Sequence, residues 1–254
     1  MSRRMALIWV IALAYFVDAA SAQPGPVLRV DGNIVKWVAP ATGSVTVITY
    51  ATLTESYALP TEKRTLSQHN CGTMRPFAEV AAVSSGISDA MAKQQLRSAF
   101  AAWESVAALK FVEVSETSRA DIIIGATDGS AGRAFANISL AGDRSVQPVA
   151  KALGVTHAPV VELSKPTPNP AVAIIERAFI CLNPNVRWKT EFDGNLEVYD
   201  LRFTLMHEIG HAIGLDHPGN SGSIMGYRYD EVVAQLQPTD IAAVRGLYGM
   251  PLVD

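Results

Sequence analysis

The spacing of apolar residues predicts three helices in this chain. Between Ile87 and Ala107 the apolar positions recur every three or four residues, which is the stripe of an amphipathic helix. A longer helix is expected from Leu196 to Leu215, where Gly214 offers the positive φ that commonly ends a helix. A last helix is expected from Pro238 to Leu247, with proline in its first turn and Gly249 just past its end.

Four stretches have the composition of strands. Val45–Leu53 is rich in β-branched and aromatic residues, and Leu109–Val114 alternates apolar with polar positions. Ala120–Gly125 is a continuous apolar run, which suits a strand buried on both faces, and Ala171–Leu182 returns to strand-like composition. Residues 126–170 are rich in turn-forming residues. Strands mixed with a few long helices predict a single α/β or α+β domain.

The first residues predict export. Arg3 and Arg4 precede an apolar run from Met5 to Val17, and Ala20-Ser21-Ala22 has the small residues that signal peptidase accepts. The apolar run is shorter than the ~20 residues that span a bilayer, so a signal peptide at residues 1–22 is favoured over a membrane anchor. We expect a secreted or periplasmic mature protein that has no contact with the membrane. Residues 23–44 are expected to form a short leader or pro-segment, and residues 45–254 the folded domain.

Composition narrows the partners and the redox state. The 254 residues carry a net charge of −3 without a long run of either sign, so nucleic acid is not an expected partner. The two cysteines, Cys71 and Cys181, both lie in the exported part, where the compartment is oxidising. One disulfide between them is the simplest interpretation, and two free thiols are the alternative.

The segment His207-Glu208-Ile209-Gly210-His211 predicts a metal site. On a helix, His207 and His211 project from one face a turn apart, so that both imidazoles can bind one ion. Gly214 can turn the chain sharply and bring His217 back toward the same point. Three neutral nitrogen ligands leave the fourth position of a tetrahedral zinc open to water, which is typical of a catalytic site rather than a structural one.

Glu208 supplies the base that such a site needs. Zinc can lower the pKa of its bound water toward ~7, while Glu208 accepts the proton and later delivers it to a leaving amine. Peptide hydrolysis requires this pairing of Lewis acid and base. A structural zinc site would need no carboxylate beside its ligand and would fill the fourth position with Cys or His.

The pattern HExxHxxGxxH followed by a methionine resembles the metzincin zinc peptidases, and Met225 lies where their Met-turn methionine would form an apolar floor under the zinc. Within metzincins, the segments LRFTLMHEIGHAIGLDH and PTDIAAVRGLYG are similar to the active-site helix and C-terminal helix of matrixins. The resemblance covers residues 45–250 with gaps. It implies a metzincin α+β fold, in which a twisted mixed sheet lies above the active-site helix and a small C-terminal subdomain lies below the cleft.

Matrixins commonly have proline two residues after the Met-turn methionine and tyrosine two residues further on, and here those positions are Tyr227 and Tyr229. Tyr229, four residues after Met225, is expected to line the substrate pocket for the residue that follows the scissile bond. Tyr227 resembles the tyrosine that reaches the zinc in astacins and serralysins, where it helps to stabilise the tetrahedral intermediate. Its alternative role is that of an aromatic side chain lining the pocket.

The segment DGSAGRAFA resembles the matrixin region that binds structural zinc and calcium and forms the substrate-aligning edge strand. Arg133 replaces the expected histidine, so we expect one catalytic zinc, leave calcium open, and regard His157 as a loop residue. If residues 134–138 form an exposed edge, a peptide could add to it as a strand. Asn70-Cys71-Gly72 resembles a matrixin cysteine switch, but Cys71 follows the first strand of the domain, which favours the disulfide.

These expectations combine into an exported, monomeric zinc endopeptidase that acts on proteins or peptides. His207, His211 and His217 would hold the metal, and Glu208 would act as general base and then acid. Two alternatives stay open, namely a zinc-bearing adhesion or binding module without turnover and a zinc hydrolase of non-peptide amides.

Overall fold

The computed structural model describes residues 25–41, 43–59, 70–82, 86–127, 132–142, 146–148, 171–219 and 222–252. The expected signal peptide, residues 128–131 and His157 lie outside the described residues. In chain order the helices and strands are β1 (Arg29–Val30), β2 (Asn33–Lys36), β3 (Thr46–Thr52), β4 (Tyr57–Ala58), β5 (Thr73–Arg75), α1 (Glu79–Ala82), α2 (Asp89–Glu104), β6 (Leu109–Glu113), η2 (Thr117–Arg119), β7 (Ile122–Thr127), β8 (Ala134–Leu140), β9 (Val146–Pro148), β10 (Val172–Leu182), β11 (Trp188–Lys189), β12 (Tyr199–Asp200), α3 (Leu201–Ala212) and α4 (Pro238–Tyr248).

A mixed sheet forms the body of the molecule. Over the described residues its main path runs β1-β2-β10-β7-β3-β6, and the strands from β2 to β6 along this path are parallel to one another. β8 pairs antiparallel with β10 and lies on its other side. β7 is buried along its whole length between β10 and β3, which confirms the prediction that this apolar run is buried on both faces.

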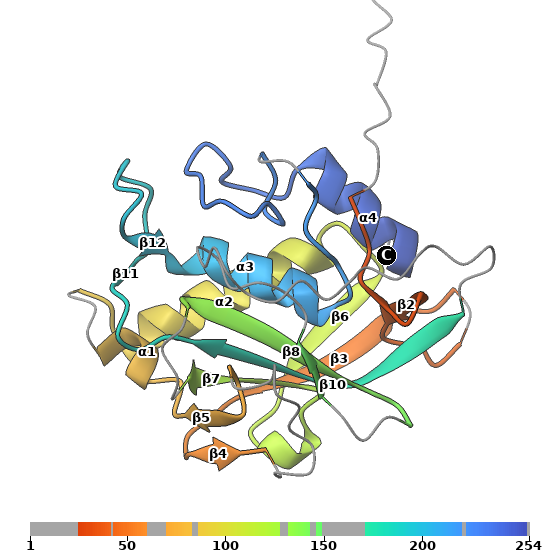
Figure 1. Cartoon of the computed structure of the whole chain (residues 1–254), viewed down its shortest axis with the longest axis horizontal. Coiled ribbons are helices and arrows are strands. Elements are labelled where there is room, and N and C mark those ends of the chain that lie inside the picture. The colour runs from red at the N-terminus through yellow and green to blue at the C-terminus, as the bar shows by residue number, and fades with distance from the viewer. Residues whose placement is uncertain are drawn as a thin grey trace, which may run out of the picture.

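Helices α2 and α3 pack against each other and cover one face of the sheet, whereas α4 lies on the side of α3 away from the sheet (Figure 1). α2 begins where the sequence predicted, because the Ser88 side chain accepts a hydrogen bond from the Met91 amide and caps the helix. Its apolar stripe buries Leu96, Phe100 and Trp103 in the core. The architecture is therefore α+β, as the sequence predicted.

α3 is shorter than the predicted helix at both ends. The carboxylate of Asp200 accepts a hydrogen bond from the Phe203 amide (2.7 Å) and caps the helix, so residues 199–200 form β12 instead of its first turn. At the other end the helix stops at Ala212, and Gly214 has a φ of +94°. The helix thus ends three residues before the predicted end at Leu215, because its last turn must open before the left-handed residue Gly214.

The sheet face opposite α3 holds a disulfide. Cys71 and Cys181 are bonded across a sequence separation of 110 residues, and both are buried in a second apolar cluster. Cys181 lies on β10 between Gly125 of β7 and Phe135 of β8. The sulfur of Cys71 is therefore engaged in this bond and is not a thiol that could act as a cysteine switch.

The expectation of an exposed edge over residues 134–138 is wrong in part. β9 pairs antiparallel with β8 at Asn137, Ile138 and Ser139, so the outer backbone groups there already have partners. All seven residues of β8 are buried. Among the described residues, β9 does not pair with residues 134–136, where a peptide could add as a strand.

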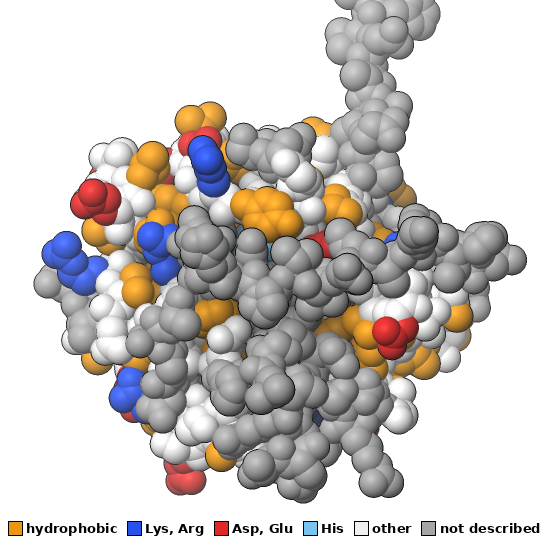
Figure 2. Space-filling model, viewed as in Figure 1, with side chains coloured by type: hydrophobic (Ala, Val, Ile, Leu, Met, Phe, Trp, Pro, Cys, Tyr) orange, Lys and Arg blue, Asp and Glu red, His pale blue; other side chains and the backbone are white. Residues whose placement is uncertain are grey.

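The described surface carries no concentration of one charge in the view of Figure 2, where basic and acidic side chains are interspersed with apolar ones. Among the described helices, none has both the length and the apolar character that crossing a membrane requires.

Candidate metal centre

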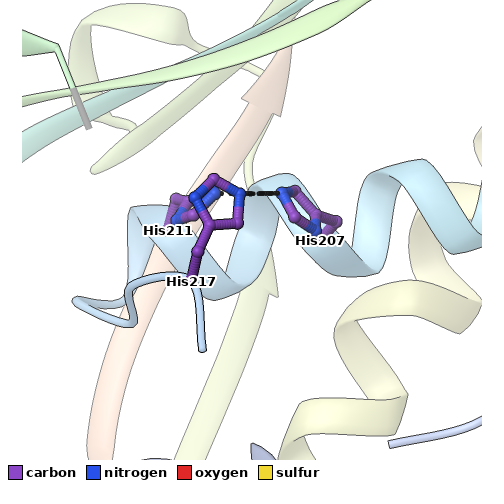
Figure 3. Close-up of side chains that lie close together, drawn as sticks. All are labelled: His207, His211 and His217. Atoms are coloured by element: carbon purple, nitrogen blue, oxygen red, sulfur yellow. Dashed lines mark hydrogen bonds between the residues drawn. The ribbon is translucent and has the colours of Figure 1, made fainter. Parts of the chain in front are cut away.

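Three histidine rings meet at one point beside helix α3 (Figure 3). His207 and His211 project from α3 one turn apart, and His217 reaches them from the segment that follows the Gly214 turn (Figure 3). The Nε2 atom of His207 lies 3.0 Å from Nε2 of His211 and 3.0 Å from Nε2 of His217. In the described part of the chain this is the one group of three or more His, Cys, Asp or Glu side chains placed to hold a metal ion.

The hydrogen-bond partners of two rings determine which nitrogen faces the centre. Nδ1 of His207 lies 2.7 Å from the carbonyl oxygen of Ile224, and Nδ1 of His211 lies 2.9 Å from that of Leu215. A carbonyl can only accept, so each Nδ1 carries the hydrogen and each neutral ring presents an Nε2 lone pair. Lone pairs that converge at 3.0 Å repel one another unless a cation lies between them, so this donor set fits zinc.

Burial keeps the three rings neutral. It lowers the pKa of His207 to about 4, because an imidazolium would lose its hydration there. The pKa values of His211 and His217 are also lowered, first by burial and then by the neighbouring histidines. Neutral imidazole is the form that binds a metal ion, so the rings need no deprotonation near neutral pH.

Glu208 follows His207 on α3 and is buried. Burial raises the pKa of its carboxyl group to about 8, because the carboxylate would lose its hydration there. A carboxyl group in such a setting has the proton affinity of a general base or acid near neutral pH.

The resemblance proposed from the sequence can now be compared with known proteins. Residues 170–249 match the family model for matrixins. The chain is 40% identical over 68 residues to human matrix metalloproteinase-26, covering 26% of this chain and 24% of that protein. It is 26% identical over 171 residues to karilysin of Tannerella forsythia, covering 66% of this chain and 31% of karilysin. A probable matrix metalloproteinase of Invertebrate iridescent virus 3 is 44% identical over 57 residues, which is 22% of this chain and 15% of that protein.

These matches support a resemblance of the chain to matrixin-like metzincins. Its mixed sheet, helix α3 and C-terminal part with α4 agree with the metzincin α+β fold. The aligned segments span less than one third of the length of each of these three relatives.

In this matrixin-like chain Met225 packs directly beneath α3. It is buried, and a Cβ atom built on Gly210 would lie 2.2 Å from its sulfur. The side chain of Met225 therefore occupies the space that the missing side chain of Gly210 leaves. This contact explains why α3 has glycine at that position.

Asp240 is a residue of the site that the sequence analysis did not single out. Its carboxylate accepts hydrogen bonds from the amides of Ile224 (3.0 Å) and Met225 (3.3 Å), and also caps α4 through the Gln237 amide. Because the Ile224 carbonyl orients His207, Asp240 positions that ring through the Met-turn. Its place in the first turn of α4 was visible in the sequence, but the contact with the Met-turn was not.

The two tyrosines occupy different surroundings. The Tyr227 ring stacks on the ring of His217, with centroids 4.1 Å apart, and 49% of the side chain is exposed. Tyr229 is buried against Phe203, donates its hydroxyl hydrogen to Glu231 (2.8 Å) and accepts one from the Asp200 amide (3.0 Å). Tyr229 therefore joins the loop after the Met-turn to the start of α3.

A pocket of about 190 Å³ lies near the start of α3, and its lining includes Phe192, Arg202 and Met206 but not Tyr229. A larger pocket of about 520 Å³ lies between the residues around Lys36 and the end of α4 and contains none of the three histidines. Arg133, at the position where matrixins have a histidine, stacks its guanidinium on the Tyr199 ring at 3.5 Å. The residues expected to bind calcium, 128–131, lie outside the described part.

Proposed function

We propose that this protein is an exported zinc endopeptidase that hydrolyses peptide bonds in protein or peptide substrates. The observation that carries the proposal is the convergence of three buried, neutral histidine rings, whose Nε2 atoms meet near the buried carboxyl group of Glu208. The matrixin likeness supports the same reaction class.

His207, His211 and His217 would hold the ion. Zinc, when bound, would supply Lewis acidity toward a water molecule and the carbonyl of the scissile bond. Glu208, as its carboxylate, would accept a proton from the attacking water, and burial, which raises its pKa, would favour the protonated form that then donates to the leaving amine. The carbonyls of Ile224 and Leu215 keep the rings of His207 and His211 in orientation throughout.

For Tyr227 the geometry favours the role of an aromatic side chain that lines the site. Its ring stacks on His217, and a stacked ring stabilises the orientation of the third ligand without use of the hydroxyl. A hydroxyl that stabilises the tetrahedral intermediate is the second role proposed for Tyr227. Tyr229 would shape the wall of the substrate pocket through its contact with the start of α3.

Export and an oxidising environment fit together in this proposal. The disulfide between Cys71 and Cys181 is the type of bond that persists outside the cytosol. Secretion itself is tested by determining the N-terminus of the exported protein, which the signal-peptide prediction places at Gln23.

The test uses the exported protein and its Glu208→Gln variant, which keeps the size of the side chain. Zinc content is measured by mass spectrometry, and cleavage is followed on casein with and without a chelator. We expect about one zinc per chain in both proteins, and a loss of 10²-fold or more in cleavage for Glu208→Gln. Zinc without cleavage by the unaltered protein would indicate the binding module. Turnover of small amides but not casein would indicate the non-peptide hydrolase, and absence of zinc would refute the proposal.

A further inference from the structure

Residues 25–37, which we term the N-terminal strap, lie along the end of α3 and along the segment between His211 and His217. The strap contains β1 and β2, joined by a tight turn at Asp31 and Gly32, both of which have positive φ. β2 adds to the main sheet by pairing in parallel with residues 172–174 of β10. In Figure 1 this strand lies near the end of α3 and below α4. The strap is thus part of the fold that surrounds the site.

The strap pairs with the segment between His211 and His217 like a neighbouring strand. The Leu28 amide donates to the Gly214 carbonyl (2.8 Å), and the Asp216 amide donates to the Pro26 carbonyl (3.0 Å). Between these two bonds Val27 and Leu215 form an antiparallel bridge. The backbone from Gly214 to Asp216 is therefore held by hydrogen bonds from outside the zinc motif.

A second set of bonds holds the last carbonyls of α3, which have no partner within the helix. The indole N–H of Trp37 donates to the Ala212 carbonyl (2.9 Å). The Tyr248 hydroxyl donates to the Ile213 carbonyl (2.7 Å) and accepts a hydrogen bond from the Trp37 amide (3.1 Å). Trp37 is buried, so these bonds are shielded from competition by water.

We propose that the N-terminal strap is a positioning element of the metal centre. It holds residues 213–217 so that the Leu215 carbonyl orients the His211 ring and the following backbone delivers His217 to the other two rings. The inference rests on the proposed role of these histidines as zinc ligands. It also assigns residues 25–37 to the functional domain, whereas the sequence suggested a leader or pro-segment over residues 23–44. Processing that removed the strap would weaken zinc binding rather than release activity.

Two strap variants and a matched control test the proposal. Leu28→Pro removes the amide that donates to Gly214, and Trp37→Phe removes the indole N–H but keeps an aromatic ring. The control is Trp188→Phe, because buried Trp188 also donates its indole N–H to a backbone carbonyl, that of Asn183 (3.3 Å), away from the strap. Affinity for Zn²⁺ is measured by competition with a chromophoric chelator, and Co²⁺ spectra report the ligand geometry. Hydrogen exchange of the Asp216 amide reports the strap pairing without any metal.

Loss of a group that orients a ligating histidine costs about 10–100-fold in metal affinity. We expect the Zn²⁺ dissociation constant to rise at least tenfold in both strap variants, with faster exchange at Asp216, and less than threefold in Trp188→Phe. If Leu28→Pro does not fold, Trp37→Phe decides. Zn²⁺ affinity within twofold of the unaltered protein in the strap variants would overturn the inference alone. An unaltered protein that binds no Zn²⁺ would instead overturn the proposed function on which it rests.

Discussion

Replacing Gly214 by alanine should destabilise both the fold and the metal centre, and the structure allows the size of the effect to be worked out. Gly214 has a φ of +94°, a conformation that costs a residue with a Cβ atom about 1–2 kcal/mol. The added Cβ would lie 2.2 Å from the carbonyl oxygen of Val35 in β2. This oxygen belongs to a strand of the main sheet, so it cannot move aside as the end of a side chain could.

The contact with Val35 adds an overpacking cost of about 1–3 kcal/mol. The reduced freedom of the unfolded chain offsets about 0.4–1 kcal/mol, because alanine is less flexible than glycine. The net loss in unfolding free energy for Gly214→Ala is therefore roughly 2–4 kcal/mol. For a domain of this size, 1 kcal/mol lowers Tm by about 2–4 °C, so a decrease of roughly 5–15 °C is expected.

The control for Gly214→Ala is Gly194→Ala. Gly194 has a φ of +81°, but its added Cβ would meet no atom within 4 Å among the described residues. Only the conformational cost then applies, and we expect a loss of about 1 kcal/mol. Unfolding by urea is measured on chelator-treated protein, so that bound metal does not contribute. Equal losses in the two variants, or unchanged zinc affinity in Gly214→Ala, would refute the reasoning about the Val35 contact.

Three further predictions concern other parts of the molecule. If the Tyr227 ring acts by stacking on His217, Tyr227→Phe should keep kcat/KM for casein peptides within about threefold. Tyr227→Ala, which removes the ring, should weaken zinc affinity. A large loss of kcat in Tyr227→Phe would instead assign the role to the hydroxyl. Replacing Cys71 and Cys181 together by serine should cost up to ~5 kcal/mol of unfolding free energy in urea titrations, because the bond closes a loop of 110 residues. Burial raises the pKa of Tyr50 to about 12, so the stabilisation by its protonated hydroxyl is complete below pH 10 and is lost between pH 10 and pH 12. In urea titrations over that range, the unfolding free energy of Tyr50→Phe should fall less steeply with pH than that of the unaltered protein.

The pattern of apolar residues was sufficient to predict α2 and β7. The apolar stripe predicted α2 to within two residues at its start, and the continuous apolar run predicted β7. The pattern was less reliable around α3, whose residues are buried on nearly all sides, so that no polar face marks where the helix begins. The start is determined by the side-chain cap of Asp200, and that cap competes with continued helix in the residues before it.

The spacing of the zinc motif predicted which side chains converge, but not what orients them. His211 takes its orientation from the Leu215 carbonyl four residues later, a contact that lies within the motif. His207 depends on the Ile224 carbonyl, whose place is determined by Asp240 in α4. Contacts of the second kind join residues that no periodicity links, so they required the three-dimensional structure.

The three histidines are therefore linked to parts of the chain at very different sequence distances. His207 is linked to α4 through the Met-turn, and in our proposal His217 is positioned by the strap, nearly 190 residues upstream by the numbering of Leu28 and Asp216. An imidazole that is free to rotate loses conformational entropy when it binds a metal ion, whereas one held by a carbonyl has already lost that entropy on folding. If the three histidines bind a metal ion as proposed, its affinity is coupled to the stability of the first and last described segments, and substitutions far from the histidines will lower it without touching a ligand.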